Sequence, residues 1–100
     1  EAQRQVRAAL AVDPSYGLAW YRLGQLLDNA KRVPEAEAAY RKAIQTDPGN
    51  VEPRKALAGL LSENARIPEA IQELEQAKAL DPNDISIGRD IERLWAKTRR

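Results

Sequence analysis

The residues best suited to bind a charged group are basic and lie near the C-terminal end of the sequence. Arg89, Arg93 and Lys97 are spaced i, i+4 and i+8, which places them on one face of a helix. Such a stripe could bind acidic side chains or a terminal carboxylate. The alternative is that these cations only complement the negative end of a helix dipole and keep the last helix soluble.

Side chains that serve as nucleophiles or general bases are scarce. The sequence has no Cys and no His, which excludes thiolate nucleophiles, imidazole bases and the ligand sets of most zinc, copper and haem sites. Ser15, Ser62 and Ser86 therefore have no His to activate them. Neighbouring glutamates such as Glu35 and Glu37 do not face each other on a helix, and no glycine pattern matches a phosphate-binding loop. The sequence predicts no enzyme activity, no metal site and no cofactor.

Length and composition favour one folded domain. The 100 residues are 43% hydrophobic and 31% charged, and no apolar run approaches the roughly 18 residues that a membrane span needs. We therefore expect no membrane insertion. The net charge of +1 creates no overall field that would attract nucleic acid, so we expect no nucleic-acid partner. Because the chain opens on Glu1 rather than Met, we expect it to be a segment of a longer protein.

The sequence repeats itself at a constant interval. Asp-Pro pairs recur at 13–14, 47–48 and 81–82, Glu-Ala pairs recur at 1–2, 35–36 and 69–70, and Lys55 precedes Arg89 by the same interval. Segments 17–50 and 51–84, each one period long, align without gaps and share ten identical residues. We call this constant spacing, which runs from residue 13 to 47 and again from 47 to 81, the period of the sequence. Such a regular period indicates an array of repeated structural units.

Each period contains two helical patterns. Trp20, Leu23, Gly24 and Leu27 follow the spacing i, i+3, i+4 and i+7, and the same spacing returns after Pro34, which suits a first helical turn. Proline at the end of each period stops the second helix, and Asn50 can cap the next one. The sequence therefore predicts six helices, at about 1–12, 16–30, 34–47, 51–64, 68–81 and 84–99.

A helix hairpin that repeats with this period resembles the tetratricopeptide repeat (TPR). The residues that carry the resemblance are Trp20, Leu23, Gly24, Leu27, Ala36, Tyr40, Ala43 and Pro48. It covers two full repeats at 17–50 and 51–84, the second half of a truncated repeat at 1–16 and a capping helix at 85–100. The resemblance implies an all-α fold, a right-handed α-solenoid of antiparallel helix pairs that forms a single domain. We call the first helix of each repeat A and the second B.

The helix phases also predict the core. We expect the following residues to be largely buried: Leu23, Leu27, Ala36, Tyr40, Ala43, Leu57, Leu61, Ala70, Leu74, Ala77, Leu94 and Trp95. Small residues such as Gly24 and Ala58 allow neighbouring helices to approach. Glu92 occupies the same position in the last helix, which suggests that no B helix packs there and that this helix ends the array.

The resemblance implies that the A helices line a concave groove that binds an extended or helical segment of another protein. The A-helix positions left free by the packing stripes are our candidate partner-binding residues: Tyr21, Arg22, Gln25, Asn29, Lys55, Gly59, Arg89 and Arg93. Glycine is costly in the middle of a helix, so Gly59 could mark a dent, flanked by Gln25, Lys55 and Arg93, that receives a ligand. The alternative is neutral drift at a tolerant exposed site.

The partner is expected to be a protein or peptide, with an acidic segment favoured by the basic stripe. The family members that clamp chaperone tails use Lys, Asn and Arg side chains at positions that are here Tyr21, Gln25, Ala56, Ser86 and Asp90, none of which matches. An alternative role is structural, in which the ends of the solenoid mediate self-association through the apolar face of helix 1–12. A second alternative, binding of RNA or lipid head groups, lacks an interleaved exposed aromatic residue.

Overall fold

The computed structural model describes residues 2–13 and 16–98, which form an all-α solenoid. Its six helices are α1 (Ala2–Val12), α2 (Gly17–Asn29), α3 (Val33–Thr46), α4 (Val51–Glu63), α5 (Ile67–Leu80) and α6 (Ile85–Thr98). The bounds agree with the predicted ones to within one or two residues. The predicted helix ends at residues 1 and 99 lie outside the described residues. The starts of α2, α4 and α6 are each separated by one period, as the repeat in the sequence requires.

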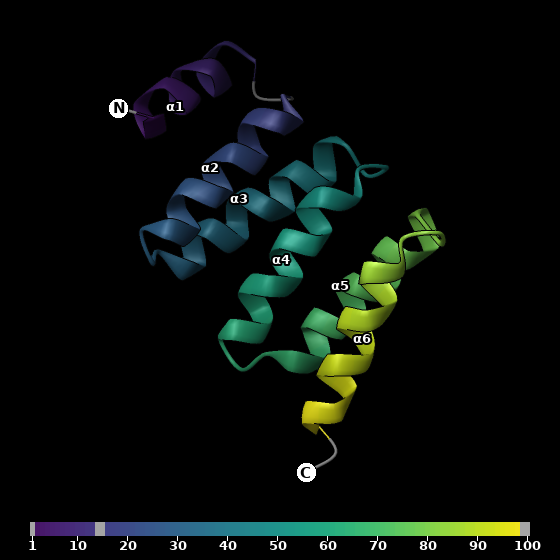
Figure 1. The fold of residues 1–100 in the computed structure, drawn as a ribbon. Helices are drawn as coiled ribbons and strands as arrows, with labels where there is room; N and C mark the ends of the chain where they lie inside the picture. Colours follow the sequence, from purple (N-terminus) through teal and green to yellow (C-terminus); the bar gives the residue numbers. More distant parts are fainter. Residues whose placement is uncertain (1, 14–15, 99–100) are drawn as a thin grey trace.

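Each helix packs against the next one in the chain, and α2 also contacts α4. Figure 1 shows the helices packed one after another along the molecule, with α1 near one end and α6 near the other. The molecule is elongated, with extents of 45 × 27 × 16 Å. None of the helices in the described ranges combines the length and the apolar character needed to cross a bilayer.

Local sequence signals explain where the helices begin. Pro34 and Pro68 lie in the first turns of α3 and α5, where a missing backbone N–H costs nothing. The side chain of Asn50 accepts a hydrogen bond from the backbone N–H of Glu52, which caps α4 as expected. The turns after α2 and α4 place Lys31 and Ala65 at φ values of 63° and 64°, so the two hairpins close in the same way.

The predicted core is confirmed except at one residue. All the predicted core residues are buried apart from Trp95, which is 45% exposed. Leu27 and Leu61 occupy the same repeat position as Trp95 and are only 2% and 1% exposed. They belong to A helices that pack against their own B helices, α3 and α5. The helix phase therefore assigned Trp95 to the packing face of α6 correctly. The predicted burial was wrong because no described helix covers that face.

Arg54 replaces Trp20 at the equivalent position of the second repeat, and polar contacts compensate for the lost ring. Its Nη1 donates to Oε1 of Gln76 at 2.8 Å and to Oε1 of Glu73 at 3.4 Å. These bonds join α4 to α5. The Nε of Arg54 is buried without a hydrogen-bond partner among the described residues.

Gly24 is the position where the absence of a side chain matters most for packing. A Cβ added there would lie 2.5 Å from Cδ1 of Tyr40, a ring that is itself 2% exposed. Gly24→Ala is therefore expected to lower the free energy of unfolding by about 1–3 kcal/mol, as overpacking of a core usually does.

Gly59→Ala is the matched control, because a Cβ there meets nothing within 4 Å. It should raise the unfolding free energy by up to about 1 kcal/mol through better helix propensity. Urea unfolding of the two variants measures both effects. Equal effects of the two substitutions would contradict the close packing of α2 on α3.

Candidate functional site

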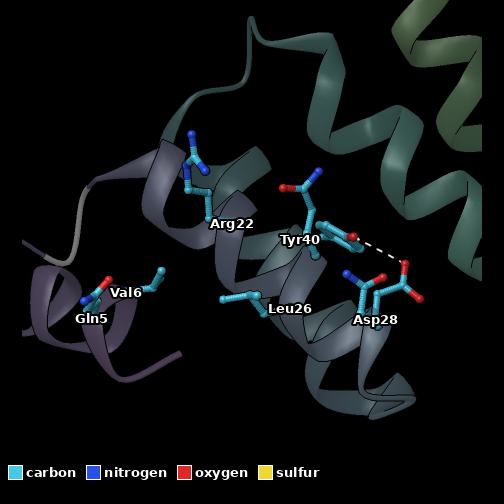
Figure 2. A pocket seen from close by; sticks show the side chains of 8 residues that line it. Gln5, Val6, Arg22, Leu26, Asp28 and Tyr40 are labelled. Carbon is cyan, nitrogen blue, oxygen red and sulfur yellow. Dashed lines mark hydrogen bonds between the residues drawn. The ribbon is translucent and has the colours of Figure 1, made fainter. Parts of the chain in front are cut away.

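The eight candidate residues lie on the A helices α2, α4 and α6, and most of them line two separate cavities. The first cavity has a volume of about 550 Å³ and is formed by α1 and α2 with one residue of α3. It is lined by Gln5, Val6, Arg22, Gln25, Leu26, Asp28, Asn29 and Tyr40. Figure 2 shows Gln5 and Val6 on α1 across from Arg22 and Leu26 on α2. Three of the predicted site residues, Arg22, Gln25 and Asn29, therefore belong to this cavity.

The second cavity is smaller, about 120 Å³, and is formed by α4 and α6 with one residue of α5. Its lining residues are Lys55, Ala58, Gly59, Ser62, Leu74, Asp90, Arg93 and Leu94. Gly59 thus lies in a real depression together with Lys55 and Arg93, as predicted. The expected third neighbour, Gln25, is not part of it and lines the first cavity instead. The reason is that the depression is formed with α6, while Gln25 lies on α2.

The two remaining candidates line neither cavity. Tyr21 is half-buried against Tyr40, with ring centroids 6.1 Å apart and planes inclined by 43°. Arg89 is exposed on α6. We call the side of α2, α4 and α6 that carries the candidate residues the inner face. It contains both depressions, and Arg89 lies next in the chain to Asp90, which lines the second one.

Tyr21 and Tyr40 both have a pKa raised above the ordinary value, so both hydroxyls are protonated at neutral pH. Burial is the largest cause that raises the pKa of Tyr40, followed by the charge of Asp28. Its hydroxyl donates to Oδ2 of Asp28 at 3.4 Å, the contact drawn in Figure 2. Burial also raises the pKa of Tyr21, and nearby Glu52 adds to this shift. Asp28 is therefore the carboxylate among the described residues that line the first cavity.

The basic residues near the second cavity differ in whether they have a carboxylate partner. Nζ of Lys55 lies 3.2 Å from Oδ2 of Asp84, and this hydrogen bond raises the pKa of the lysine. Nη2 of Arg93 lies 2.7 Å from Oδ1 of Asp90. Among the described residues no carboxylate forms an ion pair with Arg89 or Lys97.

Sequence reasoning did not assign Asp84 and Asp90 to the site. Both have a signal that could have revealed them. Asp84 follows Asn50 by one period and caps α6, because its Oδ1 accepts the backbone N–H of Ser86 at 3.0 Å. Asp90 and Arg93 are spaced i, i+3, at which opposite charges meet on a helix. The second cavity is therefore less basic than the stripe alone suggested.

The stability contributed by Asp84 is expected to depend on pH. Hydrogen bonds from the Ser86 hydroxyl and then from Lys55 hold the pKa of Asp84 below its ordinary value. A carboxyl whose pKa is lower in the folded state stabilises the fold above its unfolded pKa, about 3.9, and loses this effect as the pH falls further. Asp84→Asn should therefore lower the unfolding free energy at pH 7 and have a smaller effect at pH 3. Urea unfolding at both pH values tests this, and an equal loss at both would contradict the role of the charge.

Comparisons with known proteins agree with this architecture. Two family models, both described as tetratricopeptide repeat, match residues 1–51 and 30–89. A comparison with curated protein sequences gives no match.

Three solved structures illustrate the likeness in fold. The translocator chaperone SycD of the Yersinia enterocolitica type III secretion system is 16% identical, with a TM-score of 0.91 over 98% of this chain and 72% of the other. The first TPR of Spaghetti (RPAP3), described as bound to the HSP90 peptide SRMEEVD, is 12% identical, with a TM-score of 0.89 over 98% and 78%. An O-GlcNAc transferase of Thermobaculum terrenum is 22% identical, with a TM-score of 0.82 over 92% of this chain and 18% of that enzyme. At such identities the likeness concerns the fold alone.

Proposed function

The chain belongs to the tetratricopeptide-repeat family, and from this premise we propose that it is a non-catalytic interaction module that binds an acidic segment of a partner protein on the inner face of α4 and α6. The observation that carries the proposal is the second cavity, in which Gly59 leaves room between Lys55 and Arg93. Its volume of about 120 Å³ suits one side chain rather than a whole ligand.

A partner carboxylate can exchange with the one that Arg93 now contacts. The Arg93 side chain is 67% exposed and that of Asp90 is 36% exposed. Ion pairs so open to water contribute at most about 1 kcal/mol, so replacing Asp90 by an incoming carboxylate costs little. Bidentate contact between the guanidinium and the incoming group would offset that cost.

Further acidic side chains of the same segment would meet Arg89 and Lys97. Both are exposed, and α6 presents them on the same stripe as Arg93. Interactions along this stripe are screened by salt, so they set the orientation and association rate of the partner more than its affinity. The partner side chain that enters the second cavity supplies the specific contact.

The neighbour described as bound to SRMEEVD gives limited support for an acidic ligand. The peptide in that description contains two glutamates and one aspartate. The residues by which TPR proteins clamp chaperone tails are absent from the corresponding positions here, which include Tyr21, Gln25 and Asp90. We therefore propose an acidic segment of different sequence, held by Lys55 and Arg93.

Selection from a random dodecapeptide library tests the charge preference. Peptides that bind the native chain should be enriched in Asp and Glu, and the variant Arg89→Glu/Arg93→Glu should select Lys and Arg instead. Arg4→Glu/Arg7→Glu is the matched control, because it makes the same charge change on α1. The proposal is wrong if the native chain shows no acidic preference or if the Arg89→Glu/Arg93→Glu variant selects the same peptides.

Gly59→Gln is expected to weaken binding of a selected peptide at least tenfold, or about 1.4 kcal/mol, because the new side chain fills the depression. Gly49→Gln is the control, since Gly49 also has nothing within 4 Å but lies in the α3–α4 loop. Calorimetric titration of both variants with one peptide measures the difference. An unchanged affinity of Gly59→Gln would remove this residue from the site and leave the contacts to Arg89 and Arg93.

A further inference from the structure

We propose that the second cavity receives an aliphatic side chain of the partner segment, of about the size of valine, leucine or methionine, and that the acidic residues next to it in the partner stay outside. This inference rests on the proposed peptide site and names the kind of residue that anchors the segment there. The partner sequence it predicts has a bulky aliphatic residue flanked by Asp or Glu.

The most buried part of the second cavity is apolar. Ala58, Leu74 and Leu94 are 2%, 3% and 6% exposed, and all three belong to its lining. We call these three residues the floor of the cavity. A polar group that reached the floor would leave water and meet only hydrocarbon, which costs free energy, whereas an aliphatic group would gain from the same burial. The floor therefore favours an aliphatic side chain.

The polar side chains of the lining already have partners within the chain. The two cations, Lys55 and Arg93, each donate a hydrogen bond to an aspartate. The Ser62 hydroxyl donates its one hydrogen to the carbonyl oxygen of Gly59 at 3.0 Å. An aliphatic group that enters the cavity leaves these contacts in place, whereas a carboxylate at the same depth must compete with them.

The acidic residues of the partner find their cations outside the cavity. The Arg93 side chain is 67% exposed, and Arg89 and Lys97 are exposed on the same stripe of α6. Carboxylates that contact such cations stay largely hydrated, so they avoid the desolvation cost of a buried ion pair. The aliphatic side chain then supplies affinity by burial, and the carboxylates orient the segment.

Two sequence differences between the repeats account for the space. Leu74 and Gly59 occupy the positions that Tyr40 and Gln25 occupy one period earlier. Tyr40 fills its place, because its ring is 2% exposed and would lie 2.5 Å from a Cβ added to Gly24. A Cβ added to Gly59 would meet nothing within 4 Å. The cavity therefore comes from the side chains of this sequence and not from the helix arrangement alone.

The volume of the cavity limits the size of its occupant. A volume of about 120 Å³ equals the share of about four water molecules in the liquid, at roughly 30 Å³ each. An apolar cavity of about 150 Å³ is large enough for benzene. A branched or flexible aliphatic side chain therefore fits the second cavity, whereas the fused rings of tryptophan exceed it.

Peptides that differ at one residue test the inference. Each is a dodecapeptide of Gly and Ser with four Glu and one variable central residue, which is Ala, Val, Leu, Met, Trp, Asn or Glu. In calorimetric titration of the native chain, the best of the Val, Leu and Met peptides should bind at least tenfold more tightly than the Asn peptide, because it buries apolar surface. The Trp peptide should bind no better than the Asn peptide. Equal affinities, or tightest binding of the Glu or Trp peptide, would overturn the inference.

Gly59→Ala tests where the aliphatic side chain binds. The new Cβ takes up part of the cavity, so the Leu peptide should lose about threefold in affinity while the Ala peptide keeps its own. Gly88→Ala on α6 is the control, because a Cβ there also meets nothing within 4 Å and Gly88 does not line the cavity. In NMR spectra of the native chain, the methyl signals of Leu74 and Leu94 should shift with the Leu peptide and not with the Asn peptide. Equal losses of both peptides in Gly59→Ala, or methyl signals that do not respond, would contradict binding in the cavity.

A neutral series, with Gln in place of the four Glu, separates this inference from the proposed function. The neutral peptides should bind more weakly than the acidic ones but keep the order of central residues. If both series bind equally and keep that order, the acidic preference is wrong and the aliphatic anchor stands. If the acidic series binds better but shows no order, the aliphatic anchor is wrong and the acidic preference stands. Failure of every peptide to bind at millimolar concentration would contradict both.

Discussion

A chain shortened to residues 1–84 is expected to lose several kcal/mol of unfolding free energy and to melt far below the full chain. Removal of α6 takes away Ile87 and Leu94, which are 0% and 6% exposed, and burial of one such side chain contributes about 1.5–3 kcal/mol. It also uncovers the side of α5 on which α6 packs.

Deletion of residues 1–12 is the comparison that makes this result specific. In α1 only Leu10 is buried among the side chains that the structure describes, so this deletion should cost less. Calorimetric melting of both shortened chains gives the order of the two effects. A chain of residues 1–84 that melts within a few degrees of the full one would show that α6 does not stabilise the array.

Leu57→Ala is expected to be the most damaging single substitution in the centre of the molecule. Leu57 is 0% exposed on α4, the helix that packs against both α3 and α5. Truncation of such a side chain removes its transfer free energy and leaves a cavity, which together cost about 2–5 kcal/mol. Urea unfolding measures the loss. Leu80→Ala, at a residue that is 44% exposed, should change stability by less than about 0.5 kcal/mol, and a similar loss in both variants would contradict the assigned core.

Much of the fold follows from the sequence because its signals are local and repeated. Pro34 and Asn50 mark helix starts by their own chemistry, and Gly24 marks a close helix contact that the structure places against Tyr40. Such signals return with the period of the sequence, so one repeat predicts the next. Trp95 shows the limit of this reasoning. Its position in the repeat predicts burial, but burial also requires a covering helix, and the described chain has none there.

The candidate site was less predictable because contacts between helices define it. The helix phase correctly put Lys55, Gly59 and Arg93 together, since their positions repeat from α4 to α6. It gave no information on which neighbour closes the depression, and Gln25 was wrongly placed there. Neither did it show that Asp84 neutralises Lys55, because that pair joins α4 to the residue just before α6, and α5 separates the two in the sequence. Charge partners of this kind depend on the angle between helices, which the period alone does not specify.

Mapping of a bound acidic peptide by NMR tests the central claim most directly. Backbone amide shifts are recorded for the labelled chain during titration with a peptide selected for binding. The account predicts that the largest changes lie on the inner face of α4 and α6, at Lys55, Gly59, Arg89 and Arg93, and that they disappear in Arg89→Glu/Arg93→Glu. Changes centred on the outer faces of α3 and α5, with no response at Gly59 or Arg93, would contradict it.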